Sequence, residues 1–64
     1  MANLYREIAE TLRKEGCRPV RQGKGSHEIW FSPLTRRTFT LPSNITSKPL
    51  AYAILKQAGV PRAP

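Results

Sequence analysis

The residues best suited to chemistry lie in the stretch Arg21–Phe31, which contains the only histidine of the chain. His27 can exchange protons near neutral pH, and the glycines and cations just before it form the kind of flexible, basic loop that binds phosphate. The candidate phosphate-binding residues are Arg21, Lys24, Gly25 and Ser26. On these residues alone, a structural histidine beside ordinary surface cations and turn glycines explains the pattern as well. The stretch predicts a β-strand with an acid–base group at its start.

Length and charge limit what such a group can act on. The 64 residues make one small domain with a thin core. Eleven Lys and Arg oppose four Glu, and the resulting net charge of +7 favours a polyanionic partner. Nucleic acid and an acidic protein both fit, whereas a membrane fits poorly because no long basic amphipathic helix is present. A basic surface that serves only solubility is a further alternative.

Cysteine content and hydropathy indicate the compartment. Cys17 is the only cysteine, so the chain has no internal disulfide and little basis for a cysteine-based metal site. No apolar run approaches the roughly 20 residues that span a bilayer, and no signal-peptide pattern opens the chain. We therefore expect a soluble, cytoplasmic protein that needs no metal or other cofactor.

The apolar periodicity predicts five elements in a single domain over residues 1–64. Helices are expected at about 3–15 and 48–58, strands at about 17–22, 26–32 and 37–41, and a loose tail at 60–64. Asn3 is expected to cap the first helix, and Pro19 places the first strand at a sheet edge. With short connections, this order predicts an α+β two-layer sandwich, α-β-β-β-α, in which both helices cover one face of a three-stranded antiparallel sheet.

Strict alternation assigns the faces of the strands. It predicts that Ile29 and Phe31 face the helices, together with Phe39 and Leu41 of the third strand. The open face then carries every second residue of the second strand, and with them the threonines of the third. Those residues are Ser26, Glu28, Trp30, Thr38 and Thr40. By the same alternation His27 falls on the helix side, although its place at the end of the strand leaves both a covered and an accessible side chain possible.

Two motifs at this spacing resemble a known family. One is Arg21-x-x-Lys24-Gly25-Ser26-His27-x-x-Trp30 at the start of the second strand, and the other is Leu55-Lys56-Gln57-Ala58-Gly59-Val60 at the end of the second helix. Together with the element order, they resemble the HicA (YcfA-like) toxins of HicA/HicB toxin–antitoxin systems, over roughly Leu4 to Val60.

The resemblance implies a fold like that of double-stranded-RNA-binding domains and an activity as an mRNA interferase, an endoribonuclease that cleaves transcripts and stalls growth. It also implies a HicB-like antitoxin that covers the active site, and it gives His27 the place of the catalytic histidine. Two positions depart from the family pattern. Glu28 stands where many members have a second histidine, and Pro33-Leu34-Thr35 stands where an Asp-Gly turn is common.

These residues suggest a minimal ribonuclease, because RNA supplies its own nucleophile in the 2′-OH. His27 is expected to take the proton from that hydroxyl or to protonate the departing 5′ oxygen. Arg36 and Arg37 are expected to contact the RNA backbone. Trp30 is expected to stack a base or, by slight preference, to anchor the antitoxin, with Glu28 as a second candidate for that interface.

Two other functions fit the same pattern. One is a module that binds double-stranded RNA without cutting it, and the other is an adaptor whose basic face docks an acidic protein. The free protein is expected to be a monomer, because both helices are used in one small core.

Overall fold

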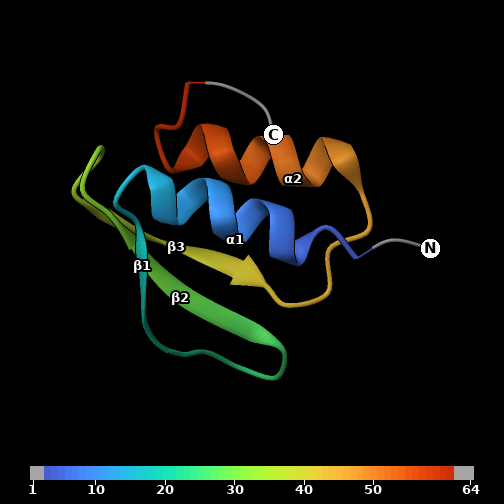
Figure 1. Ribbon diagram of the computed structural model, residues 1–64. Coiled ribbons are helices and arrows are strands. Elements are labelled where there is room, and N and C mark those ends of the chain that lie inside the picture. Colours follow the sequence, from blue (N-terminus) through green and yellow to red (C-terminus); the bar gives the residue numbers. More distant parts are fainter. Residues whose placement is uncertain (1–2, 62–64) are drawn as a thin grey trace.

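The computed structural model describes residues 3–61 and has the predicted order of helix, three strands and helix. The elements are α1 (Tyr5–Lys14), β1 (Arg18–Gln22), β2 (His27–Ser32), β3 (Arg37–Pro42) and α2 (Lys48–Gln57). The strands form one antiparallel sheet in the order β1-β2-β3, and both helices lie on the same face of it (Figure 1). The other face of the sheet is open. The predicted α+β sandwich is therefore confirmed.

The helix α1 is amphipathic, and a hydrogen-bonded asparagine precedes it. Ile8 and Leu12 are fully buried against the sheet and α2. Leu4, not Asn3, occupies the cap position, and Asn3 acts one residue earlier. Its Oδ1 accepts hydrogen bonds from the Tyr5 amide at 3.0 Å and from the Ile45 amide at 3.1 Å. Asn3 therefore joins the start of α1 to the connection between β3 and α2.

The helix α2 begins and ends as its sequence predicts. The Ser47 hydroxyl accepts a hydrogen bond from the Leu50 amide at 3.3 Å, and Pro49 lies in the first turn. Gly59 follows the helix with φ +85°, in the left-handed region that glycine favours. The expected loose tail at 60–64 is wrong at its first residue, because Val60 is buried in the core. Residues 62–64 of that tail lie outside the described residues.

The core face of the sheet differs from the prediction in one strand. Phe39 and Leu41 face the helices as expected, but on β2 it is Trp30 that faces them, opposite Phe39 and with none of its surface exposed. Ile29 and Phe31 therefore face outward. The predicted faces of β2 were wrong.

The physical reason is that two polar side chains on the inner face of β2 find partners. The Ser32 hydroxyl, fully buried, donates to the Ala58 carbonyl and accepts from the Leu34 amide at 3.2 Å. Glu28 likewise accepts hydrogen bonds from two neighbouring side chains, described below. Once these groups are satisfied, the face that carries Trp30 can be buried without unpaired polar groups, while Ile29 and Phe31 stay partly covered on the other face.

Within residues 3–61, neither helix has the length or the apolar character needed to cross a membrane.

Candidate nucleic-acid site

The turn between β1 and β2 holds His27 by its backbone. The Gly23 amide donates to the His27 carbonyl at 2.9 Å, and the His27 amide donates to the Lys24 carbonyl at 3.0 Å. The side chain of Gln22 adds two further hydrogen bonds. Its Nε2 donates to the Gly25 carbonyl at 3.1 Å and to the His27 carbonyl at 3.0 Å. The turn is therefore fixed by side-chain as well as main-chain hydrogen bonds.

Glycine is favoured at Gly25 by its conformation and at Gly23 by limited space. Gly25 has φ +57° and nothing within 4 Å of the place a Cβ would take. A Cβ on Gly23 would lie 3.1 Å from the His27 carbonyl oxygen. Neither the Gly25 nor the Ser26 amide donates a hydrogen bond to another group of residues 3–61, and both residues are exposed. These two amides are free to bind an anion.

His27 is exposed on the open face of the sheet. It pairs with Pro42 of β3 and lies on the same side of β2 as Ile29 and Phe31. The position on the helix side that strict alternation gave is therefore wrong, for the same reason that Trp30 is buried. No group of the described residues 3–61 hydrogen-bonds the imidazole, so both ring nitrogens are available.

A bulge in β1 brings two arginines to this open face. Arg18 pairs with Phe31 and Arg21 pairs with Ile29, and the register shifts between Pro19 and Arg21. Without the bulge, two residues three positions apart would point to opposite faces. Arg21 is diagonal to His27 across the strands. Residues in such positions are roughly 7–8 Å apart, with their Cβ atoms somewhat closer, which is within reach of an arginine side chain. Arg18 was not recognised in the sequence, because a bulge leaves no clear local signal.

The side-chain carboxylates of the chain all lie on the helix side of the sheet. Three of its four carboxylates lie in α1 or at the end of it, and the fourth, Glu28, is on the inner face of β2. The three cations and three carboxylates of residues 5–15 cancel, so the whole net charge of +7 lies on the rest of the chain. The open face carries Arg18, Arg21 and His27 and no carboxylate of the described residues 3–61.

Comparison with known proteins identifies the chain. The model of the family described as HicA toxin of bacterial toxin-antitoxin matches residues 5–60, which is nearly the whole length. The chain belongs to the HicA toxin family. This HicA protein is accordingly a toxin of a toxin–antitoxin system. No curated protein and no solved structure matches it.

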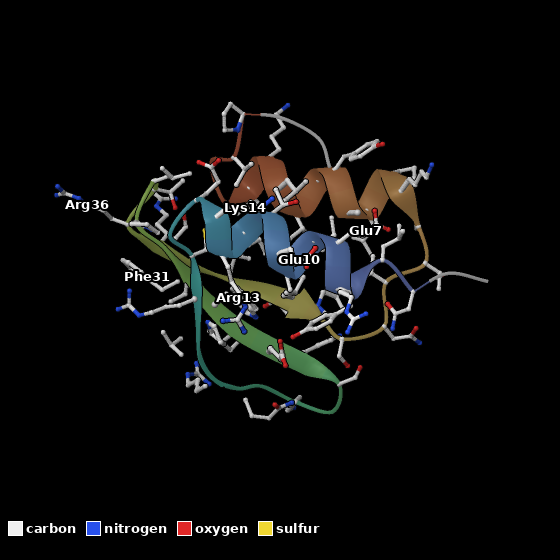
Figure 2. The ribbon with its side chains drawn as sticks, in the orientation of Figure 1. Glu7, Glu10, Arg13, Lys14, Phe31 and Arg36 are labelled. Atoms are coloured by element: carbon white, nitrogen blue, oxygen red, sulfur yellow. The ribbon has the colours of Figure 1, made fainter. Side chains whose placement is uncertain are left out.

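In this HicA toxin, the residues singled out in the sequence form two separate groups. Arg21, Lys24, Gly25, Ser26 and His27 lie together at the turn between β1 and β2. Arg36 and Arg37 lie at the opposite end of β2, about 17 Å away along the strand, where Arg36 adopts φ +58° at the tip of the hairpin (Figure 2). The structure therefore does not bring these two arginines to the histidine.

Trp30 is not available as an interface residue, and one carboxylate oxygen of the partly buried Glu28 is used within the fold. Glu28 Oε1 accepts hydrogen bonds from the Tyr5 hydroxyl at 2.7 Å and from Trp30 Nε1 at 3.0 Å. The Arg13 guanidinium lies 5.2 Å from the centre of the Trp30 ring, and Figure 2 shows Arg13 reaching from α1 towards the sheet. Because Trp30 is fully buried, the expectation that it stacks a base or anchors an antitoxin is wrong.

This cluster perturbs one titratable group. Burial raises the pKa of Tyr5 above its usual value of 10.0, and the hydrogen bond to Glu28 and the charge of that carboxylate raise it further. The Arg13 charge lowers it and offsets part of this effect. Tyr5 is therefore a neutral hydrogen-bond donor at physiological pH.

The remaining candidates for chemistry contribute little to the site. Cys17 is buried and free. Within residues 3–61, no three side chains of His, Cys, Asp or Glu lie close enough together to hold a metal ion.

Proposed function

We propose that this toxin is an mRNA interferase that cleaves transcripts, with His27 as its catalytic residue. The observation that carries the proposal is the position of His27. It is exposed on a face that holds no carboxylate of residues 3–61, beside a turn whose Gly25 and Ser26 amides make no hydrogen bond within those residues. Membership of a toxin family supports an activity that harms the cell. The excess positive charge on the rest of the molecule supports a polyanionic substrate.

The chemistry needs only proton transfer and charge stabilisation. The 2′-OH of the substrate attacks the adjacent phosphorus, the bond to the 5′ oxygen breaks, and the products are a 2′,3′-cyclic phosphate and a 5′-hydroxyl end. His27 removes the proton of the 2′-OH or supplies one to the leaving oxygen. Since the chain has one histidine, the other proton is carried by water or by another group.

The neighbours of His27 stabilise the developing charge. In the cleavage step the phosphate gains negative charge on its non-bridging oxygens. The Gly25 and Ser26 amides and the side chains of Lys24 and Arg21 are the groups placed to bind these oxygens. Lys24 lies in the turn and Arg21 approaches from β1, so the phosphate is held from two sides.

The test is cleavage of a single-stranded RNA by purified toxin, with the chemistry of the product ends determined. We expect 2′,3′-cyclic phosphate and 5′-hydroxyl ends, and a loss of about two orders of magnitude or more in rate for His27→Ala. Lys48→Ala, on the exposed start of α2, is the matched control and should cleave normally. A 5′-phosphate product, or normal cleavage by His27→Ala, would contradict the proposal.

The same experiment separates the two alternatives. A module that only binds double-stranded RNA would bind a duplex equally with and without His27 and would cut nothing. An adaptor for an acidic protein would show no salt-dependent affinity for RNA.

The partner that neutralises this toxin is proposed to be a HicB-like antitoxin that covers His27. Membership of a toxin–antitoxin family supports such a partner. We expect the free toxin to be a monomer, because the apolar faces of α1 and α2 are both used in its own core. Co-expression with the antitoxin should restore growth and block cleavage, and sedimentation of the free toxin should give the mass of one chain.

A further inference from the structure

The open face of the sheet carries one aromatic side chain, and it is Phe31. Of the five aromatic residues in the chain, Tyr5 packs against the core, Trp30 and Phe39 are buried in it, and Tyr52 is on α2. Phe31 is partly exposed and points away from both helices (Figure 2). Trp30, the residue expected to stack a base, faces the helices. Phe31 is the next residue of β2, so its ring lies on the opposite, open face.

Arg18 accompanies this ring. Its guanidinium lies 5.3 Å from the centre of the Phe31 ring, and the two residues are direct cross-strand partners. Such a pair offers both a flat apolar surface for a base and a planar cation for the phosphate beside it. Around the ring, the open face is completed by Ile29 and by the exposed hydroxyls of Thr38 and Thr40.

We infer that Phe31 and Arg18 form a subsite that stacks an unpaired base of the RNA, away from the phosphate cleaved at His27. This inference rests on the proposed function. Phe31 is four residues from His27 on the same side of β2, a distance of about 13 Å along the strand. A substrate whose phosphate lies at His27 must extend beyond its first neighbouring nucleotide to reach the ring.

The subsite selects single-stranded RNA. Bases in a duplex are stacked on each other and their faces are not available, whereas unpaired bases can be turned onto an aromatic ring. The charge of this face complements RNA, because the face between Phe31 and His27 holds Arg18 and Arg21 and no carboxylate of residues 3–61, and the aromatic ring beside these cations suits a base more than an acidic side chain. Because this face is continuous with the turn that holds His27, one RNA strand can pass over both His27 and Phe31.

The test compares two substrates that share one scissile step, a dinucleotide and a single-stranded hexanucleotide. For the wild type, the ratio of kcat/KM for the hexanucleotide to that for the dinucleotide measures what the distant contacts contribute. Phe31→Leu keeps an apolar side chain but removes the ring, and we expect the ratio to fall about tenfold or more, mainly through KM. Phe31→Tyr should keep most of the wild-type ratio. The control is Tyr52→Leu, an exposed aromatic on α2, which should leave the ratio unchanged.

A binding measurement keeps this test separate from the proposed function. His27→Ala toxin is mixed with hexanucleotides that carry the fluorescent base 2-aminopurine at successive positions. Quenching at one position that disappears in His27→Ala/Phe31→Leu supports the subsite even if the wild type cleaves nothing.

Two results would overturn the inference. One is an unchanged ratio in Phe31→Leu, which includes an equal loss of kcat/KM on both substrates. The other is a duplex that competes for binding as well as the single-stranded hexanucleotide does. If Phe31→Leu weakened only the complex with the antitoxin, the open face would belong to that protein instead.

Discussion

The Tyr5 hydroxyl donates a 2.7 Å hydrogen bond to Glu28 Oε1, and this bond joins the first turn of α1 to the strand that carries His27. The same oxygen accepts the Trp30 indole N–H at 3.0 Å. Glu28 therefore satisfies the indole N–H of the fully buried Trp30 and the hydroxyl of the partly buried Tyr5. Glu28 is the next residue after His27 and points to the opposite face, so it holds β2 in place on the helix side, behind His27.

Removing this carboxylate should destabilise the fold. Glu28→Ala leaves the buried indole N–H without a partner and removes the hydrogen bond of the partly buried phenol, and we expect the free energy of unfolding to fall by about 1–3 kcal/mol. Glu28→Gln retains a carbonyl oxygen for both donors and should lose clearly less. Urea denaturation measures both. Equal losses in the two variants would show that the charge, not the hydrogen bonding, stabilises the cluster.

The raised pKa of Tyr5 predicts a fall in stability at high pH. Below pH 10 both folded and unfolded chains keep the phenol protonated, so Tyr5 adds no pH dependence. Above it the unfolded chain loses the proton first, and the free energy of unfolding decreases as pH rises towards the higher pKa of the folded state. Tyr5→Phe should show a shallower fall over the same range. Because both proteins keep Tyr52 and all lysines, the difference between their curves isolates Tyr5, and identical curves would contradict the assignment.

The conformation of Gly25 predicts a selective sensitivity of the turn. Alanine at φ +57° is strained although space is available, so Gly25→Ala should cost roughly 1–2 kcal/mol in the free energy of unfolding. Gly25→Asn should cost less, since asparagine tolerates the left-handed region. Thermal unfolding of the two variants decides the point. A larger loss for asparagine than for alanine would mean that side-chain volume matters there after all.

Gln22 should matter for activity because it fixes the carbonyls on either side of Ser26. Gln22→Ala removes the hydrogen bonds to Gly25 and His27, and we expect cleavage of RNA to slow about tenfold through kcat. Gln57→Ala, on the exposed end of α2, is the control and should cleave as the wild type does. A change in KM alone would assign Gln22 to substrate binding instead.

Arg21 should contribute to the salt dependence of RNA binding. If its guanidinium binds one phosphate, Arg21→Gln reduces the slope of log K against log salt concentration by about 0.7. Lys48→Gln removes the same charge from the start of α2 and should leave the slope unchanged. Fluorescence anisotropy with His27→Ala toxin, which binds without cutting, gives both slopes. Equal reductions in the two variants would mean that only net charge counts.

The sequence was sufficient for those features that depend on neighbouring residues. The two helices follow from the spacing of residues such as Ile8 and Leu12, and the basic turn before His27 is a continuous segment. The faces of β2 could not be predicted from neighbouring residues. Glu28 and Ser32 form hydrogen bonds with Tyr5 and Ala58, which lie 23 and 26 residues away in the sequence. A hydrophobic pattern alone assigns such polar residues to the surface.

The contribution of β1 to the site was hidden for a different reason. All of its residues are exposed, so no apolar alternation marks its faces. The bulge near Val20 then changes which residues share a side, and it places Arg18 with Arg21 on the open face. Arg18 could therefore be recognised only from the pairing of β1 with β2.

The burial of Trp30 also gives the molecule its own optical reporter. As the only tryptophan, it is fully enclosed on the helix side of the sheet, with Glu28 on its indole nitrogen and Arg13 over its ring. Its ultraviolet emission must shift to longer wavelength when the core opens to water. RNA bound on the opposite face does not touch the indole, so the same signal stays constant during binding and records only whether the toxin is folded.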